Sequence, residues 1–301
     1  MTEGDLRWPA LPLAAWEPTR ATLHMWTQIV GKIRLALAPY QNHCWQVPLY
    51  VSARGLTTSP IPCVGGSFEM LFDFIAHELR IEKSDGAIRK LALAPRSVAD
   101  FYAEVMAALR SLDIAVRIWT MPVEIPDPIR FDEDRTHAAY DPDYANRFWR
   151  ALASVDEVLK EFRGRFIGKC SPVHFFWGSF DLAVTRFSGR RAPEIPGADR
   201  ITREAYSHEV SSVGWWPGDM PMEGPAFYAY ASPEPAGFAG APVRPSGAAY
   251  DKAASQFRLG YDLVRRAASP REAILDFCQS TYDAAANAGN WARAELEKSA
   301  S

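Results

Sequence analysis

Residues 173–187 read Val-His-Phe-Phe-Trp-Gly-Ser-Phe-Asp-Leu-Ala-Val-Thr-Arg-Phe, and the fold class follows from this stretch. Two apolar and aromatic segments, Val173–Trp177 and Phe180–Phe187, flank the turn-forming pair Gly178-Ser179. Strands joined by so short a turn run antiparallel. The stretch therefore predicts an antiparallel strand pair.

Helix signals and further strand candidates surround this pair. Asp141-Pro142 is an N-cap followed by proline at the first helical position, and a long apolar stripe at helical spacing follows it. The stripe consists of Tyr144, Phe148, Leu152, Val155, Leu159 and Phe162. Further strands are expected at 208–215, 226–230 and 257–264. The capping box Ser269-Pro270-Arg271-Glu272 predicts the start of a closing helix.

The first part of the chain has the same order of elements. A helical stripe predicts a helix over 18–37, and a strand is expected over Trp45–Ala53. Phe68, Met70, Phe72 and Phe74 alternate with other residues and predict a strand with one apolar face. Later signals predict a hairpin turned at Asp85-Gly86, a helix capped by Ser97 and a short strand over Ile114–Trp119.

We therefore predict an α+β fold with two similarly organised halves, each of them helix, antiparallel strands, helix. The halves are expected at 1–120 and 141–301, packed as one compact unit, with a Pro- and acid-rich link at 121–140. The shared order is consistent with an internal duplication. It is also the element order of the TATA-binding-protein-like fold, an analogy that carries no function.

The overall composition limits the classes of partner. The chain has 301 residues and a net charge of −3, which gives no general attraction to nucleic acid or to an anionic membrane. Its four cysteines include no C-x-x-C pair, which is typical of reduced thiols in a cytoplasm. The acidic N-terminus has no signal-peptide pattern, so we expect a cytoplasmic protein. The oligomeric state is left open.

Several runs resemble an uncharacterised bacterial domain-of-unknown-function family. These runs are residues 22–32, 54–60, 169–190 and 206–210. The resemblance extends over nearly the whole chain and implies a complete family member. It implies no activity, so the functional residues have to be inferred from their own chemistry.

The common catalytic motifs are absent from the sequence. There is no P-loop, no G-x-G-x-x-G, no H-E-x-x-H and no G-x-S-x-G. This argues against nucleotide-dependent enzymes, zinc proteases and α/β-hydrolases. No nucleotide cofactor is implied.

His174 and His208 are the leading candidates for a catalytic or metal-binding site. His174 interrupts an aromatic strand, and a buried imidazole must find a partner or face a cavity. His208 opens another strand beside Glu209, and Asp181 lies across the predicted turn from His174. Such a set could bind a divalent metal such as Fe, Mn, Ni or Zn, or act as an acid/base pair. The alternative is that each histidine is hydrogen-bonded in the core.

Other side chains are candidates for ligand binding. His24 shares a helix face with Gln28 and Lys32, beside the apolar stripe. Arg54 and Arg186 fall in or near strand segments, where an inward arginine needs an acidic partner or an anionic ligand. Trp177 and Trp215 are expected among the aromatic residues that line a small-molecule site.

Three functions remain open from the sequence alone. The first is an enzyme with an enclosed small-molecule site that uses His174 and His208. The second is a module in which the same residues only orient a ligand. The third is an interaction protein that presents the aromatic and Pro-rich segment 215–245 to a partner.

Overall fold

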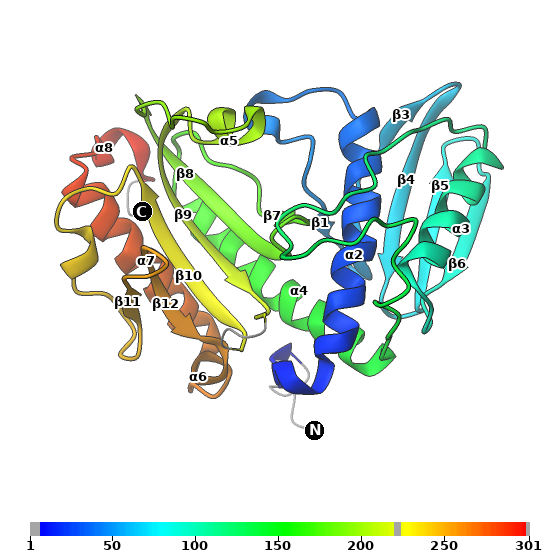
Figure 1. Cartoon of the computed structure of the whole chain (residues 1–301). Coiled ribbons are helices and arrows are strands. Elements are labelled where there is room, and N and C mark those ends of the chain that lie inside the picture. The colour runs from blue at the N-terminus through cyan, green and yellow to red at the C-terminus, as the bar shows by residue number, and fades with distance from the viewer. Residues whose placement is uncertain (1–6, 220–223, 299–301) are drawn as a thin grey trace.

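The computed structural model describes residues 7–219 and 224–298. In it the chain folds into two antiparallel sheets with helices packed on them (Figure 1). The predicted α+β class is confirmed. Within the described residues, none of the helices combines the length and the apolar character needed to cross a bilayer.

The first sheet contains short strands followed by a meander. Its strands are β1 (Tyr50–Val51), β2 (Gly55–Thr57), β3 (Ile61–Cys63), β4 (Gly66–Asp73), β5 (Glu78–Lys83) and β6 (Ile88–Ala92). Their order is β1-β2-β4-β5-β6, and β3 pairs with the start of β4. The predicted Asp85-Gly86 hairpin joins β5 to β6 and is confirmed.

Two helices pack on one face of this sheet, α2 (Leu13–Leu37) and α3 (Val98–Arg110). The Phe101 ring of α3 lies 4.5 Å from the ring of Trp26 on α2 and 6.4 Å from that of Phe72 on β4. The predicted cap is also present, because the Ser97 side chain accepts a hydrogen bond from the Asp100 amide. The alternating apolar face predicted for β4 is therefore the face that the helices bury.

The second sheet is a longer meander. Its strands are β7 (His174–Phe176), β8 (Asp181–Arg191), β9 (His208–Trp216), β10 (Ala226–Ser232), β11 (Ala249–Asp251) and β12 (Gln256–Gly260). They are arranged in the order β11-β12-β10-β9-β8-β7. The predicted turn at Gly178-Ser179 lies between β7 and β8, whose pairing confirms the antiparallel strand pair.

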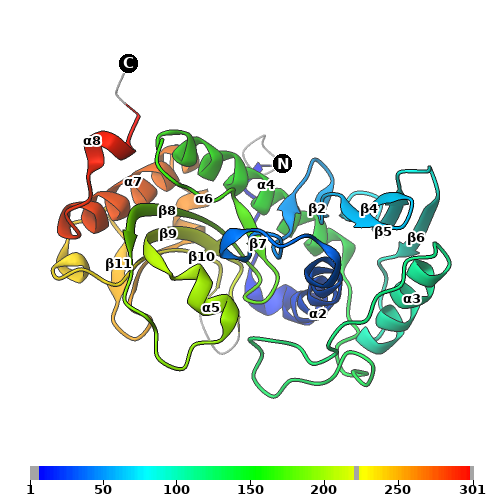
Figure 2. The same cartoon turned by 90° about the horizontal axis from the view of Figure 1, so that it is seen from above.

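The helices of the second half are α4 (Pro142–Gly164), α5 (Arg200–Ala205), α6 (Tyr261–Arg265), α7 (Pro270–Ala288) and α8 (Arg293–Leu296). The long helices α4 and α7 cover one face of the second sheet (Figures 1 and 2). Asp141 and Ser269 cap them as predicted, each accepting a hydrogen bond from a first-turn amide. The opposite face of the sheet is turned towards α5 and the first half.

Backbone hydrogen bonds and contacts between aromatic side chains connect the two halves. Leu49 exchanges two hydrogen bonds with Phe175, each 2.9 Å long, so the chain before β1 continues the pairing of β7. Phe148 on α4 is fully buried, and its ring centroid lies 5.4 Å from that of Trp16 and 6.2 Å from that of Trp215. One apolar core thus includes residues of both halves. The division at 121–140 and the internal duplication stay predictions.

The structure corrects several expected elements. The strand expected over Trp45–Ala53 is reduced to β1, because Pro48 has no amide to donate and a 3-10 turn at Asn42–Cys44 precedes it. Residues 114–119 pair with no strand and form part of an irregular segment that continues to Asp141. The helix expected over 18–37 begins at Leu13, and β12 ends at Gly260, after which α6 begins at Tyr261.

Gly31 provides a test of how α2 meets the second sheet. A Cβ atom at Gly31 would lie 2.3 Å from the Trp177 indole, whose Nε1 donates a 2.8 Å hydrogen bond to the Val47 carbonyl. We expect Gly31→Ala to displace this indole and to lower the free energy of unfolding by about 1–3 kcal/mol in urea denaturation.

Gly164→Ala is the matched control, because a Cβ atom at this helical position meets nothing within 4 Å. We expect it to be neutral or to stabilise the protein by up to about 1 kcal/mol. Equal unfolding free energies for the two variants would contradict the close packing of α2 on Trp177.

Candidate functional site

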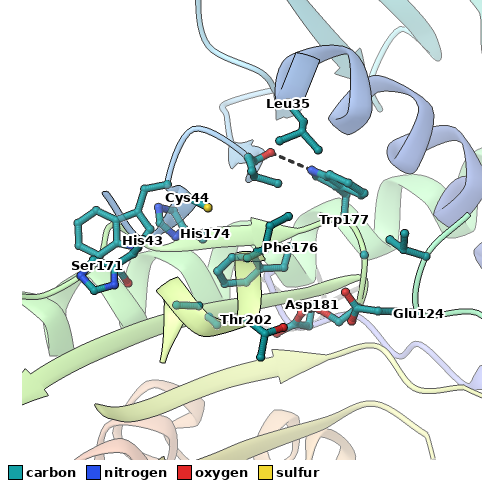
Figure 3. Close-up of a pocket in the computed structure, with 18 of the residues that line it drawn as sticks. Leu35, His43, Cys44, Glu124, Ser171, His174, Phe176, Trp177, Asp181 and Thr202 are labelled. Atoms are coloured by element: carbon teal, nitrogen blue, oxygen red, sulfur yellow. Dashed lines mark hydrogen bonds between the residues drawn. The ribbon is translucent and has the colours of Figure 1, made fainter. Parts of the chain in front are cut away.

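A cavity of about 760 Å³ lies on the face of the second sheet that α4 and α7 leave uncovered (Figure 3). Strands β7–β10 form its floor. Its walls come from the end of α2, residues 43–47, residues 117–124 and α5. The volume suits a drug-sized organic molecule.

Strand alternation determines which side chains reach this cavity. On β8, Asp181, Ala183, Thr185 and Phe187 line it, whereas the side chains between them point to the opposite face. The partners of these residues on the neighbouring strands continue the floor. They are His174 and Phe176 on β7, Val210 and Ser212 on β9, and Tyr228 and Tyr230 on β10.

Asp181 is the most buried carboxylate of the cavity, with 5% of its surface exposed. Its two oxygens accept hydrogen bonds from the Ser179 and Tyr228 hydroxyls. Burial raises the pKa of Asp181 to about 6, although these hydroxyls favour the charged form. Asp181 can therefore gain or lose a proton close to neutral pH.

A glycine allows Tyr228 to reach Asp181. Gly214 is paired with Ala183 on one side and with Tyr228 on the other. A Cβ atom at Gly214 would lie 2.4 Å from the Tyr228 hydroxyl and 2.5 Å from the Leu182 carbonyl oxygen. The tyrosine ring occupies this space, so β9 must have no side chain at this position.

Further hydroxyl groups line the same floor. The Tyr206 and Tyr230 hydroxyls are 2.8 Å apart, and those of Thr185 and Ser212 are 2.9 Å apart. The rings of Tyr228 and Tyr230 stack at an interplanar angle of 14°. Burial raises the pKa of both tyrosines well above the ordinary value, so they remain neutral. The floor thus presents neutral hydroxyls beside one ionisable carboxylate.

A second carboxylate, that of Glu124, approaches Asp181 from the loop after residue 120 (Figure 3). The Glu124 backbone has a positive φ of 56°, which is uncommon outside glycine. Glu124 is an exposed residue, but its carboxyl group loses part of its hydration in the cavity, and this loss, followed by the negative charge of Asp181, raises its pKa. The negative charge of Asp181 therefore opposes the ionisation of Glu124.

His174 lines the cavity without a hydrogen-bond partner. It is fully buried, and neither ring nitrogen has a partner among the described residues. Its ring packs edge-on against Trp45, Tyr50 and Phe176. Burial lowers the pKa of His174 to about 3, and the positive charge of Arg34 acts in the same direction. The imidazole is therefore neutral at physiological pH.

A different group of basic residues lies at the His43 side of the cavity. Lys169 donates to Nε2 of His43, and Nδ1 of His43 donates to the Glu204 carbonyl at 2.9 Å. The His208 ring lies 5.8 Å from that of His43. Burial, together with Lys169, lowers the pKa of His43. His208 thus contacts this group and makes no ring contact with His174.

Lys32 lies in the wall formed by α2. Its ammonium donates to the Trp119 and Met121 carbonyls and lies 4.6 Å from the centroid of the Trp119 ring. Burial lowers the pKa of Lys32 to about 8. These contacts fix residues 119–121 against the helix, and they commit the donors of Lys32 to the protein.

The remaining predicted site residues lie in different environments. Trp177 lines the cavity, and His24 supports the turn below it through a 2.8 Å hydrogen bond to the Gly178 carbonyl. Four other predicted site residues lie outside the cavity, where they contact other parts of the protein. Arg54 pairs with Asp73, Arg186 is stacked on Phe162 behind the sheet, Trp215 is in the core, and Glu209 pairs with Arg190.

The metal prediction gains no support from this geometry. Among the residues that the structure describes, no group of three or more His, Cys, Asp and Glu side chains could hold a metal ion. Metal binding by His174 and His208 stays a prediction.

A family model matches residues 8–298 of the chain, and its description is "Family of unknown function (DUF5996)". The chain belongs to this family. The resemblance inferred from sequence is therefore confirmed over nearly the whole length. No curated protein and no solved structure gives a significant match. The DUF5996 match brings no activity, so the cavity itself has to support the functional argument.

Sequence reasoning did not find Glu124 or the three tyrosines Tyr206, Tyr228 and Tyr230. Glu124 lies in an irregular segment that gives no periodic signal, and only tertiary packing brings it to Asp181. The alternation in Phe227-Tyr228-Ala229-Tyr230 indicates a strand whose tyrosines share one face. Only the pairing of β10 with β9 shows that this face lines the cavity.

Asp181 should make stability depend on pH in an unusual direction. Its folded-state pKa lies above the ordinary value, so the folded protein binds the proton more tightly than the unfolded chain does. Wild type should therefore lose up to about 3 kcal/mol of stability, relative to Asp181→Asn, as pH rises from 4 to 7. Urea unfolding at several pH values measures this difference.

Asp73→Asn is a control of opposite sign. Asp73 is also buried, but hydrogen bonds from Arg54 and from two backbone amides lower its pKa. Asp73 therefore contributes stability at pH 7 that is lost as pH falls, and its replacement should destabilise the protein near neutrality. A destabilised Asp181→Asn variant at pH 7 would contradict the assignment of Asp181 as an uncompensated buried charge.

Proposed function

We propose that this protein binds a small organic molecule in the cavity on the floor of β7–β10. The observation that carries the proposal is the unpartnered imidazole of His174. A fully buried polar group without a hydrogen bond costs about 1–3 kcal/mol, and folded proteins rarely leave one unsatisfied. A ligand with a hydrogen-bonding group next to His174 would remove this cost.

The arrangement of polar and apolar groups supports the same proposal. Trp45, Trp177, Phe176 and Phe187 contribute aromatic surface, and the polar groups are gathered at a few positions. His174 is paired with Ala183, so Asp181 is its diagonal neighbour on β8, roughly 7–8 Å away. That gap is too wide for a direct hydrogen bond, and a ligand could contact both side chains.

An enzyme using the same site is a second candidate, favoured by the acid/base properties of Asp181. A carboxyl group with a pKa of about 6 beside a cavity suits proton transfer near neutral pH. His174 would then orient the substrate as a neutral donor or acceptor. Turnover that is lost in Asp181→Asn, with binding retained, would separate this candidate from a binding module.

The interaction-protein alternative has less support. Trp215 is fully buried in the core, so it is shielded from any partner outside the molecule. Trp216 and Tyr230 are only partly exposed, and Tyr230 faces the cavity.

Phenol is a suitable probe of the cavity, because it combines an apolar ring with one hydroxyl group. We expect millimolar phenol to shift the amide resonances of β7–β10 in ¹H–¹⁵N spectra. Ala183→Phe should abolish these shifts, because Ala183 lies in the cavity floor and a phenylalanine there would fill the space. Ala254→Phe, on an exposed turn, is the matched surface control and should leave them unchanged. Shifts that persist in Ala183→Phe would contradict the proposal.

His174→Phe should separate a ligand-binding role from a structural one. This substitution removes two buried ring nitrogens that have no hydrogen-bond partner among the described residues. It should leave the unfolding free energy unchanged or raise it by about 1–2 kcal/mol, and it should weaken phenol binding. His24→Phe is the contrast, because it removes the donor of a bond to the Gly178 carbonyl and should destabilise the protein. Destabilisation of His174→Phe to the same degree would indicate a core histidine.

A further inference from the structure

We infer that the molecule bound in this cavity is an organic cation, an amine whose ammonium group lies against Asp181 and Glu124. The inference rests on the proposed function and adds the charge class of the ligand. It is supported by the pairing of carboxylates throughout the described part of the chain.

Asp181 differs from the other buried carboxylates. The described residues include four buried aspartates, and three of them have a basic partner. Asp73 pairs with Arg54, Asp156 with Lys160 and Asp134 with His137. Within the same residues, no lysine, arginine or histidine forms an ion pair with Asp181. Buried charges are normally paired, so a positive charge is missing at this position.

The neutral hydroxyls around Asp181 do not replace that charge. Ser179 and Tyr228 donate one hydrogen bond to each oxygen, and each carboxylate oxygen can accept a second. Glu124 adds a second carboxylate beside Asp181, and no described basic side chain forms an ion pair with it. Two adjacent carboxylates without a cation favour a ligand that carries one.

The basic residues that line the cavity, and Lys169 beside it, do not neutralise the Asp181 end of the cavity. Lys32 is committed to two backbone carbonyls and to the Trp119 ring. Arg117 is exposed on the wall and forms no ion pair with Asp181 or Glu124. Lys169 is bonded to His43, at the side of the cavity away from Asp181 (Figure 3). The positive charge at Asp181 would therefore have to come from the ligand.

Two further features suit an amine with an organic body. The rings of Tyr228 and Tyr230 line the cavity floor near Asp181 and add aromatic surface for the organic part of the ligand. His174 supplies an independent indication of a ligand, because it belongs to the lining of the same cavity and its two ring nitrogens have no hydrogen-bond partner among the described residues. The ligand would thus place an ammonium at Asp181 and a hydrogen-bonding group near His174.

Three probes of similar size and different charge test the inference at pH 7.5. They are 2-phenylethylamine, which is protonated, 2-phenylethanol, which is neutral, and 3-phenylpropionate, which is anionic. Titrations followed by calorimetry or NMR should give an affinity for the amine at least about 10-fold higher than for the alcohol. The anion should bind most weakly.

Isosteric variants show which carboxylate causes the preference for the amine over the alcohol. Asp181→Asn should remove most of the preference for the amine over the alcohol, and Glu124→Gln should remove a smaller part. Asp156→Asn removes a buried carboxylate outside the cavity and should leave the preference unchanged. Loss of the preference in Asp156→Asn would attribute it to net charge and overturn the inference.

The outcomes distinguish the inference from the proposed function. If wild type binds the alcohol or the anion as tightly as the amine, the ligand is not selected by positive charge, and only the inference fails. If none of the three probes binds folded wild type at millimolar concentration, the proposed binding function fails as well.

Discussion

In a β-strand, alternate side chains point to opposite faces of the sheet. In β8–β10 one face packs in the core and the other lines the cavity. One face packs against α4 and α7 and contributes Val184, Val213 and Phe227 to the core. The other face carries Asp181, Ser212 and Tyr228 into the cavity. A shift of the register by one residue would exchange the two sets, so the core that stabilises the sheet also determines the composition of the cavity floor.

The burial of Asp181 in the cavity floor costs the folded protein stability. Its carboxyl group is buried with hydroxyl donors and without a cation, and Glu124 brings a second negative charge close to it. Buried aspartates elsewhere in the described chain have basic partners, which shows that the fold can provide them. Functional sites commonly retain groups that lower stability, and an unpaired carboxylate beside an unpaired histidine fits that pattern.

Sequence reasoning succeeded where the signal was local. The Asp85-Gly86 turn, the Asp141-Pro142 helix start and the turn at Gly178-Ser179 depend on a few adjacent residues, and each is present. It failed over Trp45–Ala53, where Pro48 and the preceding 3-10 turn leave only the short strand β1, and over Ile114–Trp119, where the apolar residues pair with no strand. His174 was selected because a polar side chain in an aromatic strand is unusual, and the structure places it in the cavity lining together with Asp181 and Trp177. Arg54 and Arg186 could not be placed without tertiary contacts.

The central claim is that Asp181 is a buried, uncompensated carboxylate facing the cavity. The most direct test is a ¹³C NMR titration of the aspartate side-chain carboxyl resonances, with the Asp181 signal assigned by its loss in Asp181→Asn. We expect a titration midpoint near pH 6 for this residue in the ligand-free protein. A midpoint at or below the ordinary aspartate value, near pH 4, would mean that solvent or a cation already stabilises the charge, so Asp181 would not be an uncompensated carboxylate.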